Sequence, residues 1–248
     1  MTTALVTGPT AGIGAVFARR LAAEGHDLVL VARDETRLKE LASSLPGRAE
    51  VLVADLATGE GCSAVEARLA EGVDILVNNA GFGVHGKFLQ APVDDELRMF
   101  GVNARAVLRL SLAALPPMVQ RGSGDIINVS SVAGFTARGS YAATKAYVTT
   151  LSRSMQVEVA GKGVRVCAVC PGFTHTEFHD RAGMDMTKLP SWAWLSAERV
   201  VDEGLRDLRA GKAVSVPSKR YKAAALLSRY MPMQLTAKVS SRTGRKYR

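Results

Sequence analysis

Tyr141 and Lys145 are the residues of this chain best suited to acid–base chemistry, because a spacing of four places both on one face of a helix. Their side chains would then lie about 6 Å apart along the helix axis. An ammonium group this close to a phenol favours the phenolate. We therefore expect the pKa of Tyr141 to fall from about 10 toward neutral pH, where a phenol can both donate and accept protons efficiently.

A serine pair, Ser130 and Ser131, stands shortly before this tyrosine. Side chains alternate across an extended chain, so the two hydroxyl groups point to opposite sides and only one can face Tyr141. A hydroxyl group that faces the tyrosine could hold a substrate oxygen while negative charge develops on that oxygen. The serines and the tyrosine–lysine pair together suit a reaction that moves a proton onto or off an oxygen atom.

Three glycines near the amino terminus, Gly8, Gly12 and Gly14, separate an apolar strand (4–7) from a helical pattern (13–24). Glycine at such positions permits a tight turn and a close approach of the backbone to a phosphate. The free N–H groups at the helix start then meet the negative charge. This segment predicts a site for the pyrophosphate of a dinucleotide.

These motifs resemble the short-chain dehydrogenase/reductase family over residues 1 to about 217. The resemblance rests on the glycine loop, Asn78 to Gly81, Asn103, Ser131, Tyr141, Lys145 and Pro171-Gly172. It implies a Rossmann-type fold, a nicotinamide cofactor, and hydride transfer that interconverts a ketone or aldehyde and an alcohol. Two features depart from the family pattern: Pro9 removes one backbone donor from the glycine loop, and Ser131 stands only ten residues before Tyr141.

The resemblance also implies a role for each catalytic residue. Tyr141 would be the acid and base, while Lys145 would lower its pKa and bind the ribose. Ser131, the second serine of its pair, would hold the substrate oxygen. Asn103 would support a proton relay, with an ordinary mid-helix asparagine as the alternative.

The end of the second predicted strand bears on which cofactor is used. Ala32 stands where an NAD site usually has a carboxylate, and Arg33 follows it. A guanidinium group binds phosphate in a bidentate manner, so NADP(H) is favoured over NAD(H), with Arg33 as chief determinant and Arg37 as a second. Asp34 is interpreted as a helix N-cap.

The remaining cofactor contacts are expected at strand ends and in the loops that follow them. Asp55 would accept from the adenine amino group if the resemblance holds; a cap or turn aspartate is the alternative. The complete predicted cofactor set is Gly8, Thr10, Gly12, Ile13, Gly14, Arg33, Arg37, Asp55, Leu56, Asn79, Ala80, Gly81, Tyr141, Lys145, Pro171, Gly172, Thr174 and Thr176.

No metal site is expected. Cys167 and Cys170 match Cys-x-x-Cys, but residues three apart in a strand face opposite ways, whereas a metal needs both sulfur atoms on one side. His175 and His179 are four apart but have no third ligand nearby in the sequence, so a surface or lid role is preferred.

Apolar runs of strand length alternate with longer helical patterns, which predicts a doubly wound α/β domain with a seven-stranded, mainly parallel sheet and helices on both faces. The expected strands are 4–7, 28–31, 51–54, 75–77, 126–129, 164–169 and 214–216. The expected helices are 13–24, 35–45, 61–70, 94–119 and 140–160. Residues 1–217 would form one catalytic and cofactor-binding domain, in which 173–195, lacking a clear period, would be a mobile substrate flap.

The formal charge of +9 belongs to the carboxyl terminus, because residues 211–248 hold ten Lys/Arg and no acidic residue. Residues 218–248 are therefore predicted to be a basic, partly helical tail. A solvated surface, contact with an anionic membrane and contact with a partner subunit are its alternative roles; nucleic acid is disfavoured. No apolar run is long enough to span a membrane, so a cytoplasmic protein is expected, with membrane association through the tail as the alternative.

The leading functional hypothesis is an NADP(H)-dependent oxidoreductase acting on an apolar carbonyl compound. Apolar residues of the expected flap (Phe178, Met184, Met186, Trp192 and Trp194) suggest this substrate class, although they could equally serve packing. The competing hypothesis is a non-catalytic NADPH-binding sensor or scaffold. The family resemblance further implies a homodimer or homotetramer that associates through 94–119 and 140–160.

Overall fold

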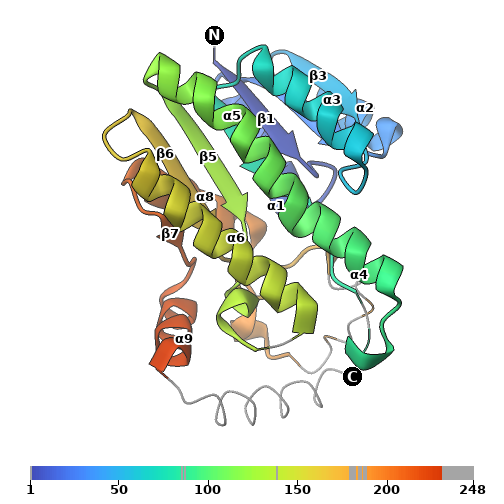
Figure 1. Cartoon of the computed structure of the whole chain (residues 1–248), viewed down its shortest axis with the longest axis vertical. Helices are drawn as coiled ribbons and strands as arrows, with labels where there is room; N and C mark the ends of the chain where they lie inside the picture. Colours follow the sequence, from blue (N-terminus) through green and yellow to red (C-terminus); the bar gives the residue numbers. More distant parts are fainter. Residues whose placement is uncertain are drawn as a thin grey trace.

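A seven-stranded sheet forms the centre of the protein in a computed structural model, which describes residues 2–84, 86, 88–137, 139–178, 183, 186 and 189–230 (Figure 1). Its spatial order is β3-β2-β1-β4-β5-β6-β7, and every neighbouring pair is parallel. The strands are β1 (Thr3–Thr7), β2 (Asp27–Ala32), β3 (Ala49–Val53), β4 (Ile75–Asn78), β5 (Gly124–Val129), β6 (Val164–Val169) and β7 (Val214–Ser215).

The helices connect successive strands and cover both faces of the sheet, as predicted, although the helix between β6 and β7 was not among the expected ones (Figure 1). The α-helices are α1 (Gly12–Ala23), α2 (Glu35–Ser44), α3 (Gly59–Ala70), α4 (Val93–Phe100), α5 (Val107–Arg121), α6 (Gly139–Glu158), α8 (Ala197–Arg209) and α9 (Lys219–Tyr230). Shorter turns are η1 (Phe88–Gln90), the π-helix η2 (Gly101–Ala106), η3 (Val132–Phe135) and η4 (Ser191–Ala193).

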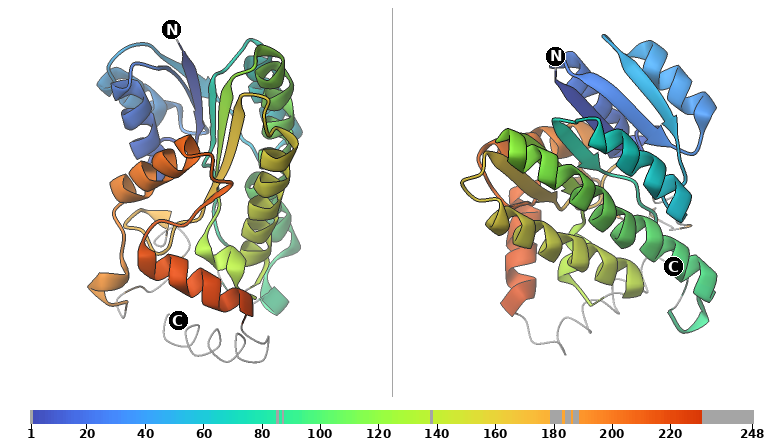
Figure 2. Two further views of the ribbon diagram at one scale, coloured as in Figure 1. Left: turned by 90° about the vertical axis from the view of Figure 1, so that its left-hand side faces the viewer. Right: turned by 45° about the horizontal axis from the view of Figure 1, so that its top comes forward.

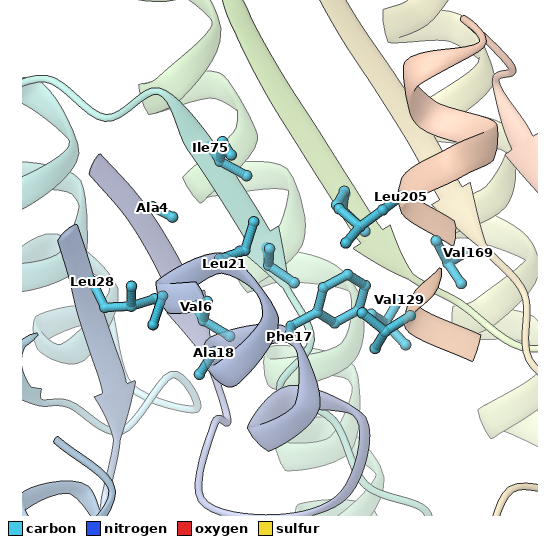
Figure 3. Close-up of a cluster of buried hydrophobic side chains, with 14 of the residues drawn as sticks. Ala4, Val6, Phe17, Ala18, Leu21, Leu28, Ile75, Val129, Val169 and Leu205 are labelled. Atoms are coloured by element: carbon cyan, nitrogen blue, oxygen red, sulfur yellow. The ribbon is translucent and has the colours of Figure 1, made fainter. Parts of the chain in front are cut away.

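Strands that are apolar at successive positions supply two cores, because alternate side chains point to opposite faces. On one face, Val6 and Val129 pack with α1, α2 and α8. Figure 3 shows Phe17 of α1 beside Val129 in this cluster. On the other face, Leu5 and Ile126 pack with α3, α5 and α6. The predicted doubly wound parallel sheet is therefore confirmed, and it is wholly parallel.

The segment predicted as one helix over 94–119 is divided in three. Helix α4 passes into the π-helix η2, which passes into α5. A π-turn inserts an extra residue into the helical repeat and is frequent at functional sites. Hydrophobic periodicity cannot reveal such an insertion, because apolar residues continue on both sides of it.

Helix α9 lies beyond the carboxyl end of β5 and packs against η3 (Figure 2). This helix lies at the start of the basic tail, where a helix was predicted. Most of the tail, residues 231–248, falls outside the described residues, so its contacts and the boundary at Pro217 stay predictions. Within the described part of the chain, no helix is both long and apolar enough to cross a membrane.

Candidate active site

The glycine loop and the start of α1 form one end of the site. Gly8 and Gly12 have φ angles of 63° and 54°, in the left-handed region that favours glycine. Helix α1 has no side-chain cap and no acidic residue in its first turn, so the N–H groups of that turn remain available for an anion. These observations fit the predicted pyrophosphate site, where Thr10 and Ile13 are partly buried.

Asn79 and Thr7 hold this loop in place. The Asn79 amide donates to the carbonyl oxygens of Thr7 (3.0 Å) and Gly8 (2.9 Å), and the Thr7 hydroxyl accepts from the backbone N–H groups of Asn79 and Ala80, both at 3.0 Å. A Cβ on Gly14 would lie 2.2 Å from the Gly8 oxygen, which explains the glycine there. Sequence reasoning missed Thr7, although its position at the end of β1 was a usable signal.

At the predicted adenosine end, Asp55 makes a turn and an ion pair. Its carboxylate accepts from the backbone N–H of Ala57 at 2.9 Å and pairs with Arg98 of α4, also at 2.9 Å. These contacts match the turn-aspartate alternative, and no described contact tests the adenine role. Leu56 beside it is buried.

The two arginines predicted for a 2′-phosphate differ in their surroundings. Arg33 is exposed directly after β2. Asp34 is the N-cap of α2, as predicted, and accepts from the Arg37 backbone N–H at 3.0 Å. The Arg37 guanidinium group reaches across to Glu177, 3.3 Å away on the segment after β6. A phosphate at this point would thus meet a guanidinium group that already has a carboxylate neighbour.

The two serines divide as the alternation rule predicts. The Ser130 hydroxyl is buried, donates to the Lys145 carbonyl oxygen at 2.7 Å, and lies 2.8 Å from the Thr149 hydroxyl. The Ser131 hydroxyl accepts from the Ala133 backbone N–H at 3.1 Å and lies close enough to the Tyr141 hydroxyl to lower the pKa of that phenol. The structure therefore brings Ser131, rather than Ser130, to the tyrosine.

Lys145 lies at the centre of the cluster and is 4% exposed. Its Nζ atom donates to the Val129 carbonyl oxygen at 2.8 Å and stands 5.8 Å from the centre of the Tyr141 ring. A Cβ on Gly81 would lie 3.3 Å from this Nζ atom and 3.0 Å from Oδ1 of Asn103. Gly81 thus lies where Lys145 and Asn103 approach each other.

The expected direction of the Tyr141 pKa is wrong for this structure. Burial raises the pKa of Tyr141 above its ordinary value, and the hydrogen bond with Ser131 only partly opposes the rise. Burial also lowers the pKa of Lys145 to about 8. The reason is that removing both groups from water disfavours their charged forms.

Asn103 occupies the π-helix η2 and is fully buried. Its amide makes two bonds with the backbone of Phe82: it accepts from the N–H at 3.0 Å and donates to the carbonyl oxygen at 2.9 Å. It also lies 3.4 Å from the Thr144 hydroxyl. These contacts tie η2 to the loop after Gly81 and to α6, so Asn103 positions the cluster; the proton relay is not tested by them.

The segment after β6 closes over the glycine loop. The Pro171 carbonyl oxygen accepts from the Val132 backbone N–H at 3.0 Å, and the Thr174 hydroxyl donates to the Gly172 oxygen at 3.0 Å. The Thr176 side chain lies against Gly12, because a Cβ atom on Gly12 would lie only 2.8 Å from the methyl group of Thr176. Of the two threonines, Thr176 therefore adjoins the predicted pyrophosphate site.

Other parts of this segment surround the tyrosine. The rings of Phe178 and Tyr141 are 5.6 Å apart. Met184 and His179 fall outside the described residues. Cys167 and Cys170 are buried, and burial raises the pKa of each thiol, to about 12 and about 11. Among the described residues there is no cluster of three or more His, Cys, Asp or Glu side chains suited to a metal ion.

Comparison with known proteins agrees with this geometry. The chain is 37% identical to a short-chain dehydrogenase from Sphingobium yanoikuyae in complex with NADPH, with a TM-score of 0.84 over 98% of this chain and 94% of that one. It is 34% identical to the bulky-bulky ketone specific alcohol dehydrogenase from Comamonas testosteroni, with a TM-score of 0.79 over 94% and 95% of the two chains.

Sequence relatives point the same way. The chain is 38% identical to oxidoreductase UcpA from Escherichia coli over 184 residues, which are 70% of each protein. The family model of short chain dehydrogenases matches residues 2–186, which include the glycine loop, Asn103, Ser131, Tyr141 and Lys145. The chain therefore belongs to the short chain dehydrogenase family.

Proposed function

We propose that this protein is an NADP(H)-dependent oxidoreductase that interconverts a ketone or aldehyde and an alcohol. The observation that carries the proposal is the cluster of Ser131, Tyr141 and Lys145 next to a glycine loop whose helix start is uncapped. A bound nicotinamide would supply or accept the hydride. The protein's own part is to hold the reacting oxygen and to exchange its proton.

Each side chain has a separate task in this proposal. The Ser131 and Tyr141 hydroxyl groups hold the substrate oxygen, and the Tyr141 phenol donates its proton to that oxygen during reduction. A raised pKa suits the donor, because the phenol stays protonated until the alkoxide forms. Lys145 sits behind the ring, where positive charge stabilises the phenolate left after the transfer.

The choice of NADP(H) rests on the end of β2. The last residue of β2 is Ala32, where an NAD site usually has a carboxylate, and the exposed Arg33 follows it. Arg37 adds a second guanidinium group one helical turn further. The relative from Sphingobium yanoikuyae, which is in complex with NADPH, supports the same choice.

A largely apolar carbonyl substrate is the class that the surroundings of Tyr141 favour. The Phe178 ring flanks the tyrosine on the segment after β6. The bulky-bulky ketone specific alcohol dehydrogenase from Comamonas testosteroni, to which this chain is similar, supports a ketone as the substrate.

The test is a screen of ketones and aldehydes for oxidation of NADPH, with Tyr141→Phe beside the native enzyme. The variant is expected to lose turnover by about 100-fold or more, the usual contribution of a general acid, and to retain its Kd for NADPH. Tyr147→Phe, at an exposed tyrosine on the same helix, is the control. A native protein that binds NADPH but reduces no compound in a broad panel would favour the sensor hypothesis instead.

A further inference from the structure

Tyr221, in the first turn of α9, joins two residues that are distant in sequence. Its hydroxyl oxygen accepts a hydrogen bond from the Phe173 backbone N–H at 3.2 Å and donates one to the Ala193 carbonyl oxygen at 2.7 Å. Phe173 and Ala193 lie at opposite ends of the segment 173–195. One hydroxyl group therefore holds both ends of this segment together.

The ring of Tyr221 packs against the turn that follows β6. A Cβ on Gly172 would lie 2.2 Å from two carbon atoms of this ring, so glycine is what lets the ring approach the backbone. The ring also packs against the buried cluster of Ala168, Cys170 and Val216, and residues of η3, which directly follows Ser131, pack against the same cluster. Helix α9 thus contacts η3, which follows the serine, while its Tyr221 contacts the chain after β6.

The rest of α9 reinforces this contact. The Arg220 guanidinium group donates to the Trp192 carbonyl oxygen at 2.9 Å and lies 5.6 Å from the centre of the Trp192 ring. Ser218 directly precedes the helix, and its backbone N–H donates to the carboxylate of Glu203 in α8 at 3.2 Å. A helix anchored in this way cannot turn Tyr221 away without breaking several contacts.

The ends of 173–195 also pair with each other. The Leu195 backbone N–H donates to the Phe173 carbonyl oxygen at 2.8 Å, and the His175 N–H donates to the Leu195 oxygen at 3.0 Å. The Tyr221 hydroxyl adds two hydrogen bonds beside this pairing, one with Phe173 and one with Ala193. The same segment carries Phe178, whose ring flanks Tyr141.

We propose that Tyr221 is a positioning residue that holds Phe173 and Ala193 together and thereby sets the position of Phe178, an apolar side chain beside Tyr141 that would contact the substrate. The proposal rests on the proposed function for its kinetic consequence, but the contact itself does not depend on catalysis. Tyr221 contacts neither Tyr141 nor Lys145 in any described contact. Its removal should consequently change substrate binding rather than the chemical step.

The variant Tyr221→Phe keeps the ring against Gly172 and removes both hydrogen bonds. We expect the KM of a bulky apolar ketone to rise about tenfold, the factor that corresponds to about 1.4 kcal/mol, while kcat and the Kd for NADPH stay unchanged. Hydrogen exchange at the Phe173 amide, followed by mass spectrometry of the peptide that contains it, should become faster. Tyr147→Phe should alter neither measurement.

The two measurements separate the ways in which the idea can fail. Unchanged exchange at Phe173 would show that the hydroxyl group does not hold the segment. Faster exchange with an unchanged KM would show that the contact has no part in substrate binding, and a fall in kcat equal to the loss in kcat/KM would assign Tyr221 to the chemical step. If the native enzyme reduces no carbonyl compound, the proposed function fails, while exchange at Phe173 still decides whether Tyr221 holds the segment.

Discussion

Replacing Lys145 with methionine should make the stability of the cofactor-free protein respond to pH in a specific way. Lys145 is buried, and burial lowers its pKa from 10.5 to about 8. Because one pKa unit corresponds to about 1.4 kcal/mol, the folded protein carries a cost of about 3 kcal/mol for a charged Lys145 at pH values well below 8. Methionine of similar length removes this cost.

The sign of the effect follows from which state holds the proton. Below pH 8 the lysine is protonated in both the folded and the unfolded protein, so the full cost applies. Between pH 8 and pH 10.5 the folded protein releases the proton and the unfolded chain keeps it. The native protein therefore gains free energy of unfolding relative to Lys145→Met as the pH rises through this window.

A second effect opposes the stability that Lys145→Met gains at neutral pH by removing the buried charge. The Nζ atom of Lys145 donates to the Val129 carbonyl oxygen at 2.8 Å, and leaving a buried acceptor without its donor costs about 1–3 kcal/mol. This cost does not depend on pH in the same range. At any single pH, the difference in free energy of unfolding between the two proteins contains both effects. Only the effect of the buried charge changes with pH, so the change of this difference with pH measures it.

The assay is urea unfolding of both proteins at several pH values from 7 to 10.5. The difference in free energy of unfolding should move by about 2–3 kcal/mol in favour of the native protein as the pH rises. Lys162→Met, at an exposed lysine, should show no such trend. A difference that stays constant for Lys145→Met would refute the argument that burial sets the pKa of Lys145.

Two further predictions concern the cofactor. Gly14→Ala places a Cβ 2.2 Å from the Gly8 oxygen and 2.3 Å from Nδ2 of Asn79, so the loop must shift and the Kd for NADPH should rise at least about tenfold in a fluorescence titration, whereas Gly59→Ala, with open space around its Cβ, should bind normally. Glu177→Gln removes the carboxylate 3.3 Å from Arg37, so the KM for NADPH should fall several-fold and that for NADH should not change. Equal changes with both cofactors would show that Glu177 does not act through the 2′-phosphate.

The order of the strands, and of the helices that precede β6, followed from the sequence because local rules decide it, whereas helix α8 (Ala197–Arg209) was not predicted. Apolar runs such as 164–169 form strands wherever they are covered on both faces, and the left-handed backbone at Gly8 and Gly12 favours glycine by local geometry. Alternation along the chain likewise predicted that only one of Ser130 and Ser131 would face Tyr141. Each of these inferences depends on residues close together in the sequence.

What the tertiary structure alone decided depends on burial and on distant partners. The direction of the Tyr141 pKa follows from how much water the fold removes, which no local spacing records. The π-turn at Asn103 and the ion pair of Arg37 with Glu177 require elements that meet only in space. Tyr221 shows the same limit: the sequence predicted only a basic, partly helical tail there, and packing placed the Tyr221 ring against Gly172. Local composition determined the elements, and long-range packing determined the environment in which each functional group titrates and binds.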